Sequence, residues 1–248
     1  GQLIARKTGD DYILNGQKSA WVSNGTFATH SWLHIGLDPR YGMAGQGMAV
    51  CPLDLPGISR GKPLDKIGQR PLNQGEIFFE DVHLPKQYMV IDAEAYQAMR
   101  TAGTRAGGGQ PPMASMAVMF AGMAKAALDE AIAYARNTIE GGKPIFEHKH
   151  ISLKLFEMFM KVESARSLAR RMYQFNAFSG GNSMSHVMAG KWMSTVTAYE
   201  VASDAIQIFG TAGASKQYNI EKLFRDARSS IIEDGVNESL ALNVVDLL

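Results

Sequence analysis

The spacing of apolar residues changes once along this chain, and this change constrains the fold more than any other feature. Up to Val90, short apolar or alternating runs are separated by turn-forming residues, as is typical of β-strands. From Met113 onward, apolar residues recur at spacings of three and four, the pattern of a buried helix face. We therefore expect an α+β protein, with a small antiparallel β-barrel or sandwich domain followed by an up-down helical bundle.

The change also predicts where the domains lie. Residues 1–90 are expected to form the β-domain, residues 91–112 a linker with a short helix and a Gly/Pro loop, and residues 113–248 a four-helix bundle. Asn15-Gly16, between two apolar runs, predicts a hairpin turn. A helix over 151–178 is expected to bury one continuous stripe, which consists of Leu155, Phe159, Val162, Ala165, Leu168 and Met172.

Composition excludes several classes of function. A net charge of +1 over 248 residues offers no basic surface for nucleic acid. No apolar run approaches the ~20 residues that span a bilayer. Cys51 is the only cysteine, so neither an internal disulfide nor a thiolate metal site is expected, and a cytoplasmic location is the default. The six histidines lack the spacing of a zinc site, so no metal is expected.

Three local stretches have the residue types for chemistry. Trp21 and Ser23 lie two apart, so in a strand both project to one side, where an indole and a hydroxyl suit a heteroaromatic ring. The alternative is a core tryptophan beside a hairpin. Glu233-Asp234 lies in a Gly-containing turn, where a carboxylate acts either as a base or as a helix cap. The third stretch, Gln207 to Gly213, ends a long helix.

In this order, the stretches resemble the acyl-CoA dehydrogenase family, and the resemblance covers nearly the whole chain. Its pieces are Tyr12-Ile13-Leu14-Asn15-Gly16-Gln17-Lys18 with Trp21-Val22-Ser23-Asn24-Gly25, Pro56-Gly57-Ile58, Gly68-Gln69-Arg70, Phe79-Glu80-Asp81-Val82-His83-Leu84-Pro85, Ala127-Leu128-Asp129-Glu130-Ala131, Glu147-His148, Gln207-Ile208-Phe209-Gly210, and Glu221-Lys222-Leu223 with Arg225-Asp226-Ala227.

The resemblance implies an FAD protein that oxidises an acyl-CoA thioester to a 2-enoyl-CoA. A carboxylate takes the α-proton, and the β-hydrogen leaves as hydride to flavin N5. Trp21 is implied to pack on the isoalloxazine ring, and Ser23 to lie near N5. The implied cofactor-binding residues are Trp21, Val22, Ser23, Lys149, Gln207, Ile208, Phe209, Gly210, Thr211, Val236 and Glu238.

The resemblance also implies partners. The segment from Gln207 to Thr211 would reach the FAD of a neighbouring subunit, which makes the protein a homo-oligomer, either a dimer or a tetramer. The electron acceptor would be an electron-transfer flavoprotein or a similar protein. The N-terminal helical domain of the family is absent, so the chain is expected to be a fragment.

The sequence departs from the family at the base and at the cofactor. Asp234 stands where the family usually has Glu, so Asp234 is the predicted base, with Glu233 in reserve. Thr138 and Gly141 replace an Arg and a Phe, and Lys149 is the candidate replacement cation. These losses keep two alternatives open, namely a non-catalytic structural subunit and a flavin monooxygenase on the same fold.

Overall fold

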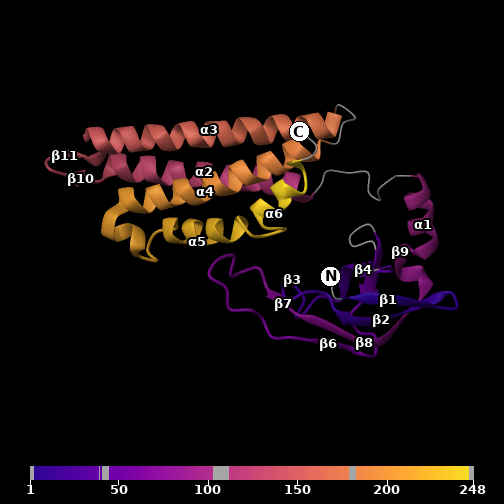
Figure 1. The fold of residues 1–248 in the computed structure, drawn as a ribbon. Coiled ribbons are helices and arrows are strands. Elements are labelled where there is room, and N and C mark those ends of the chain that lie inside the picture. Colours follow the sequence, from indigo (N-terminus) through magenta and orange to yellow (C-terminus); the bar gives the residue numbers. More distant parts are fainter. Residues whose placement is uncertain (1–2, 39, 41–44, 103–111, 179–182, 246–248) are drawn as a thin grey trace. The chain divides into compact units, whose positions relative to one another are not determined.

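The computed structural model describes residues 3–38, 40, 45–102, 112–178 and 183–245. They form two compact units (Figure 1): one from residues 3–66 and 70–102, the other from 67–69 and 112–245. The first unit is rich in strands and the second is helical, so the predicted α+β class is confirmed. Most of the predicted Gly/Pro loop, residues 103–111, lies outside the described residues.

The first unit is a seven-stranded sheet with a small two-stranded ribbon beside it. The strand order of the sheet is β6-β8-β2-β1-β4-β5-β9, and every pairing is antiparallel except the parallel pair β1–β4. Alternating residues of the strands fill one core, for example Ile77 and Phe79 of β8. The strands are β1 (Ile4–Thr8), β2 (Asp11–Gln17), β3 (Val22–Ser23), β4 (His30–Gly36), β5 (Gln46–Pro52), β6 (Ile58–Arg60), β7 (Gln74–Gly75), β8 (Ile77–Leu84) and β9 (Met89–Ile91).

The hairpin turn predicted at Asn15-Gly16 is wrong. Strand β2 runs through both residues, and its register against β8 shifts between Leu14 and Gly16, which marks a β-bulge. The turn between β1 and β2 lies at Gly9-Asp10, where Gly9 has φ +62°. Gly16 has φ +115°, and because bulges and hairpin turns both favour residues with positive φ, the Asn-Gly signal does not distinguish them.

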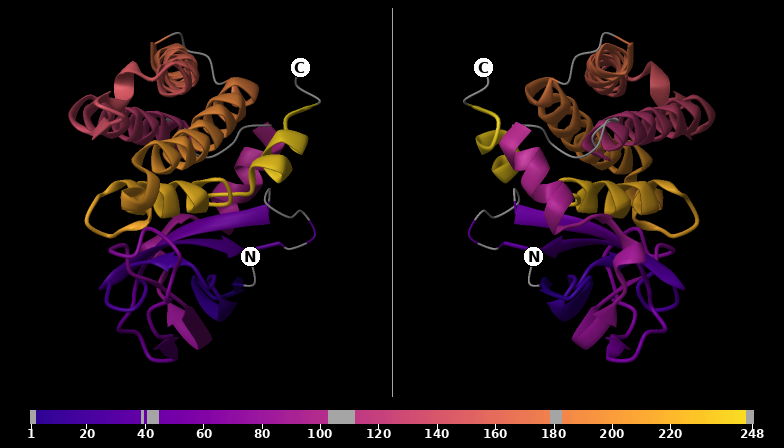
Figure 2. Two further views of the ribbon diagram at one scale, coloured as in Figure 1. Left: turned by 90° about the vertical axis from the view of Figure 1, so that its left-hand side faces the viewer. Right: turned by 90° about the vertical axis from the view of Figure 1, so that its right-hand side faces the viewer.

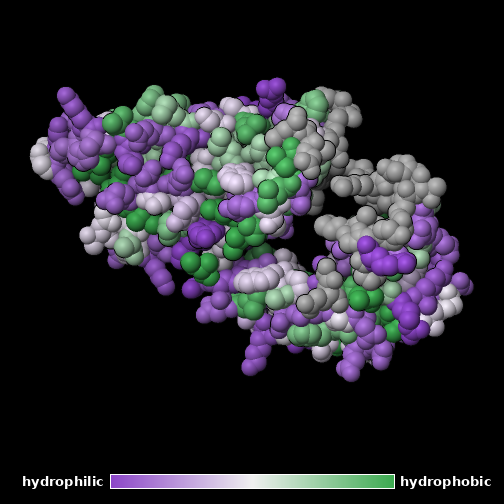
Figure 3. Space-filling view, viewed as in Figure 1, coloured by the Kyte–Doolittle hydropathy of each residue, from purple (hydrophilic) through white to green (hydrophobic). Residues whose placement is uncertain are grey.

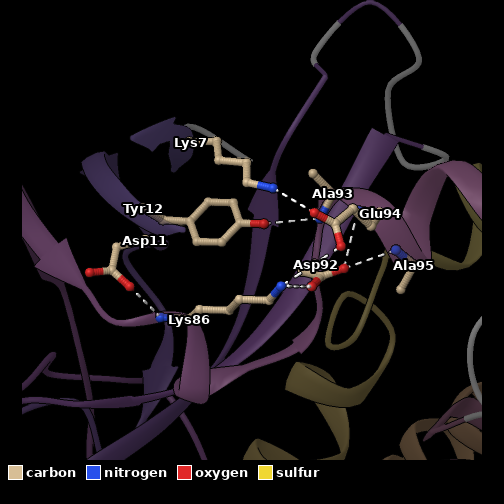
Figure 4. Close-up of polar contacts among 8 residues, drawn as sticks. All are labelled: Lys7, Asp11, Tyr12, Lys86, Asp92, Ala93, Glu94 and Ala95. Carbon is tan, nitrogen blue, oxygen red and sulfur yellow. Dashed lines mark hydrogen bonds and ion pairs between the residues drawn. The ribbon is translucent and has the colours of Figure 1, made fainter. Parts of the chain in front are cut away.

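Helix α1 (Ala93–Ala102) closes the first unit and is tied to the sheet at its first turn (Figure 4). The Asp92 carboxylate accepts hydrogen bonds from the backbone N–H groups of Glu94 (3.1 Å) and Ala95 (2.8 Å), as an N-cap does. The hydroxyl of buried Tyr12, on β2, accepts the first helical N–H at 3.0 Å. The helix start therefore has side-chain acceptors for three of its unpaired N–H groups.

The second unit is built on three long helices that lie side by side in Figure 1 and are viewed from either end in Figure 2. They pack on one another and on the shorter α5 through a core of alanine, larger aliphatic and aromatic residues. The elements are α2 (Pro112–Asn137), β10 (Ile139–Glu140), β11 (Lys143–Pro144), α3 (Lys149–Phe178), α4 (Met184–Phe209), α5 (Ile220–Ser230) and α6 (Asn237–Leu242).

The stripe predicted for α3 is correct in period but wrong at two positions. Leu155, Val162, Ala165 and Met172 are buried as expected. Phe159 is 48% exposed and Leu168 is only half-buried, whereas the neighbouring residues Met158 and Ala169 are buried instead. Adjacent apolar positions fit the same periodicity, so packing against the neighbouring helices decides which of the two is buried.

The surface of the helical unit mixes hydrophobic and hydrophilic side chains on the face seen in Figure 3. Four large hydrophobic residues in the N-terminal half of α3 are about half exposed or more: Leu153, Phe156, Phe159 and Met160. None of the described helices combines enough length with enough apolar character to cross a membrane.

Candidate functional site

The stretch around Trp21 forms an exposed ribbon on the first unit. Strands β3 and β7 pair through Val22↔Gly75 and Ser23↔Gln74. Ser23 is exposed, and Trp21, just before the strand, is 60% exposed, so the alternative of a core tryptophan does not hold. The indole face of Trp21 is therefore accessible to a flat ligand.

The carboxylates Glu233 and Asp234 lie in the turn between α5 and α6. Asp234 is exposed and has a left-handed backbone, with φ +51°, and Gly235 follows with φ +110°. Residues other than glycine adopt that conformation rarely, and Asp is among those that tolerate it. The N-cap of α6 is Val236, which makes no side-chain capping bond, so Asp234 is not the cap that the sequence offered as an alternative.

Helix α4 contacts this turn through a side chain that was not predicted from the sequence as part of the site. Lys191 is only 1% exposed, and its ammonium donates a 2.6 Å hydrogen bond to the carbonyl of Gly235. Burial lowers the pKa of Lys191, while the nearby carboxylates of Asp234, Glu233 and Glu238 oppose that shift. The available signal was a lone lysine within an apolar helical run, Met188-Ala189-Gly190-Lys191-Trp192-Met193.

The segment 67–69 packs on α5 and supports the same turn from another side. Gln69 donates its backbone N–H to the buried carboxylate of Asp226 and its side-chain amide to Glu233. Gly68 lies so close to α5 that a Cβ there would come within 2.2 Å of the Arg225 carbonyl oxygen. Two pieces of the resemblance, Gly68-Gln69 and Arg225-Asp226, are therefore in direct contact.

A cavity of about 680 Å³ lies at the junction of α2, α3 and the end of α4. Gln207, Ile208, Phe209, Gly210 and Thr211, all predicted as site residues, line it. Its aromatic wall consists of Tyr134 and Phe209, whose rings stack with centroids 4.0 Å apart. Gly141, which stands where the resemblance implies a Phe, is among the lining residues and adds no side chain to the cavity.

The basic residues that line the cavity do not include Lys149, the cation predicted from the sequence. Lys149 is exposed at the start of α3 and is not among the lining residues. His148, His150 and Lys154 line the cavity, and Lys154 forms an ion pair with Asp204 at 3.0 Å. The spacing of four between His150 and Lys154 on one helix was the signal that would have pointed to Lys154.

Apart from Lys149, the predicted residues fall into three places, namely the ribbon, the cavity and the turn at the start of α6. Trp21, Val22 and Ser23 belong to the first unit, whereas the rest belong to the second. Within the second unit, the turn residues Glu233 and Asp234, like Val236 and Glu238 that follow them, do not line the cavity. In the described part of the chain, no group of three or more His, Cys, Asp or Glu side chains is arranged to hold a metal ion.

Comparison with known proteins assigns both units. Residues 2–82 match the model of the acyl-CoA dehydrogenase middle domain, and residues 113–247 match that of the acyl-CoA dehydrogenase C-terminal domain. Among curated relatives, cyclohex-1-ene-1-carbonyl-CoA dehydrogenase of Geobacter metallireducens is 29% identical over 95% of this chain and 62% of its own length. The mitochondrial short-chain specific acyl-CoA dehydrogenase of Rattus norvegicus is 31% identical over 94% of this chain and 55% of its own length.

Solved structures give the same assignment. Butyryl-CoA dehydrogenase from Megasphaera elsdenii superposes with a TM-score of 0.86 at 29% identity, covering 99% of this chain and 63% of the other. A chain in the structure of the electron transferring flavoprotein of Acidaminococcus fermentans also gives a TM-score of 0.86, at 27% identity, and again covers 99% of this chain and 63% of the other. This chain therefore spans about six tenths of the length of such relatives, and it belongs to the acyl-CoA dehydrogenase family.

Proposed function

We propose that the chain is part of an FAD-dependent enzyme that oxidises an acyl-CoA thioester to a 2-enoyl-CoA, with Asp234 as its base. The observation that carries this proposal is the Asp234 turn: an exposed carboxylate on a left-handed backbone that is held from two sides. A carboxylate carried on a backbone that is held in this way suits proton abstraction, because a base must be positioned before its pKa matters.

The reaction divides between the carboxylate and the cofactor. Asp234 would take the α-proton and become a neutral acid, while the C–H electron pair forms the new double bond. FAD, when bound, would accept the β-hydrogen with its electron pair. The Glu233 carboxylate accepts a hydrogen bond from the Gln69 side-chain amide, so Asp234 is the better candidate of the two carboxylates.

The described residues fit a flavin dinucleotide. The exposed indole of Trp21, with the Ser23 hydroxyl two residues away, suits a flat heteroaromatic ring with polar edges. The cavity beside Gln207 has aromatic side chains and the basic groups of His148 and Lys154, which suit an adenine ring and phosphates. Because the resemblance places the Gln207 segment against the cofactor of a neighbouring subunit, we expect a homo-oligomer.

Two further observations support partners. The exposed hydrophobic side chains in the N-terminal half of α3, such as Phe156, would be covered by a second copy of the chain. A shared fold with a chain in an electron transferring flavoprotein structure fits an acceptor of that kind. The relatives are longer than this chain, which fits a larger parent protein.

The test is reduction of bound flavin by acyl-CoA. The flavin-loaded protein is mixed anaerobically with a panel of acyl-CoA esters, and loss of visible flavin absorbance is followed. Asp234→Asn should slow this reduction by about 10²- to 10⁴-fold, the usual contribution of a positioned base, without loss of flavin. Asp129→Asn, the same change at an exposed carboxylate on α2, is the matched control and should react like the wild type.

The outcomes separate the alternatives. Rapid reduction of a flavin-loaded Asp234→Asn variant would refute the assignment of the base, and Glu233→Gln would then be tested. Flavin that no acyl-CoA reduces, but that transfers an oxygen atom to a substrate once it is reduced chemically and exposed to oxygen, would favour a monooxygenase. A protein that binds no flavin in any assembly would favour a structural subunit.

A further inference from the structure

Lys191 is a buried ammonium that the reaction itself does not use. It lies in the N-terminal third of α4, between the exposed Trp192 and the buried Gly190, and is only 1% exposed. Taking a charge out of water is costly unless hydrogen bonds compensate for the lost hydration. A lysine in this position therefore needs a structural or functional reason.

The partner of Lys191 is a backbone carbonyl at the functional turn. The hydrogen bond that the described residues provide for the ammonium goes to the Gly235 oxygen, at 2.6 Å. Gly235 follows Asp234 directly, so the bonded carbonyl belongs to the same left-handed turn that presents the carboxylate. Glu233, Asp234 and Glu238 lie near enough to raise the pKa of Lys191, although burial lowers it overall.

A second buried contact from α4 holds the far side of the turn. The Asn237 side chain, which is 2% exposed, donates a 3.0 Å hydrogen bond to the hydroxyl of Thr195, one helical turn after Lys191. The Thr195 hydroxyl in turn donates to the backbone carbonyl of Lys191 at 2.9 Å. Two neighbouring side chains of one helix thus hold residues 235 and 237.

The turn needs such support because its backbone is strained. A non-glycine residue with φ +51°, as at Asp234, costs free energy that the surrounding contacts must offset. An aspartate also has one carbon fewer than a glutamate, about 1.5 Å less reach. With only two side-chain torsions, the position of its carboxylate depends strongly on the backbone of the turn.

We propose that Lys191 is a positioning residue, which fixes the Asp234–Gly235 turn through the Gly235 carbonyl and so sets where the Asp234 carboxylate meets the substrate. The proposal rests on the assignment of Asp234 as the base. Lys191 touches neither substrate nor cofactor in this role. Its effect is on the rate of proton removal and not on the affinity for the substrate.

The experiment compares Lys191→Met with Lys191→Arg in the flavin-loaded protein. Methionine has a similar length but no donor, whereas arginine keeps one. Because a misplacement of about 1 Å can cost a factor of ~10², Lys191→Met should lower kcat by about 10- to 100-fold, with KM and flavin content within about twofold of the wild type. Lys191→Arg should recover at least part of the loss. Lys125→Met, the same change at an exposed lysine of α2, is the control.

Hydrogen–deuterium exchange supplies a readout that does not depend on turnover. Lys191→Met should speed exchange in peptides covering residues 231–237 and leave α2 and α3 unchanged. Where Lys191→Met does not fold, Lys191→Gln, which is polar but one bond shorter, replaces it with the same expected result. Ser194→Ala, which removes another buried polar group of α4, should leave the turn unchanged.

The inference and the proposed function fail in different ways. Unchanged kcat and unchanged exchange in Lys191→Met, with Asp234→Asn inactive, would overturn the inference alone. Faster exchange throughout α4 and α5 with loss of flavin would also overturn it, because that result indicates a general structural role. An active Asp234→Asn would overturn the base assignment, and with it the inference. If no acyl-CoA reduces the wild type, the exchange of residues 231–237 alone decides whether Lys191 holds the turn.

Discussion

Replacing Gly68 with alanine tests how segment 67–69 is seated on α5. The added Cβ would lie 2.2 Å from the Arg225 carbonyl oxygen, 2.5 Å from its carbon and 2.8 Å from the Asp226 nitrogen. All three are rigid backbone atoms and all three distances are far inside contact, so the segment must move away. Gly68 does not have a positive φ, so alanine can adopt its backbone conformation. The effect of the substitution therefore comes from the clash of the added Cβ.

The cost of this movement has two parts. Overpacking of a tight contact costs about 1–3 kcal/mol. Displacement also removes the hydrogen bond from Gln69 to the Asp226 carboxylate, and a bond to a charged group contributes about 1.5–3 kcal/mol. Together these give about 2.5–6 kcal/mol. For a chain of this length, each kcal/mol lowers Tm by about 2–4 °C, so the melting temperature of the helical unit should fall by at least about 5 °C.

The assay is thermal unfolding followed by helical circular dichroism, with Gly122→Ala as the matched control. Gly122 lies in α2, and a Cβ added there would meet open space, with nothing within 4 Å, so the same substitution should stabilise the helix by about 0.5–1 kcal/mol. The two variants should therefore shift Tm in opposite directions. A Gly68→Ala protein that melts within about 2 °C of the wild type would refute the close approach to α5.

Three further predictions concern the first unit. The N–H of Ala95 and the charge of Lys86 hold the pKa of Asp92 below its ordinary value of 3.8, so Asp92 stabilises the fold above that pH and this contribution is lost as pH falls through the folded pKa. Asp92→Asn should thus flatten the acid-induced fall of Tm, and a variant with the same slope as the wild type would contradict this. Burial raises the pKa of the Cys51 thiol to about 12. A thiol reagent at neutral pH should therefore modify Cys51 only as fast as the protein unfolds. Fast labelling of the folded protein would exclude the buried position. Tyr12→Phe removes the acceptor for the first N–H of α1. The free energy of unfolding, measured by urea titration, should fall by about 1–3 kcal/mol. No change would mean that water replaces the hydroxyl.

Much of the architecture could be predicted from the sequence because it depends on local periodicity. The period of three to four between Leu155 and Met172 predicts α3 and most of its buried face. The fold class follows from the change in pattern after Val90. By contrast, Asn15-Gly16 was assigned to a turn because positive φ is a local property, whereas the pairing of β2 with β8 that makes it a bulge is a long-range one.

The residues of the candidate site could be predicted from the sequence only where they follow one another along the chain. Gln207 to Thr211 do line one cavity, because they follow one another at the end of a single helix. Lys191 and Gln69 could not be placed by spacing, since their contacts to Gly235 and Glu233 join positions 44 and 164 residues apart. The role of Lys149 stays a prediction, although the cavity is lined by Lys154 instead.

The contact between Gln69 and Asp226 also has a consequence for biosynthesis. The two residues are 157 positions apart, and the acceptor carboxylate is made long after its donor. At a synthesis rate of about 5–20 residues per second, segment 67–69 waits roughly 8–30 s on the ribosome before α5 emerges. During that time the segment has no α5 to pack on, so the helical unit can close around residues 67–69 only after α5 has been made.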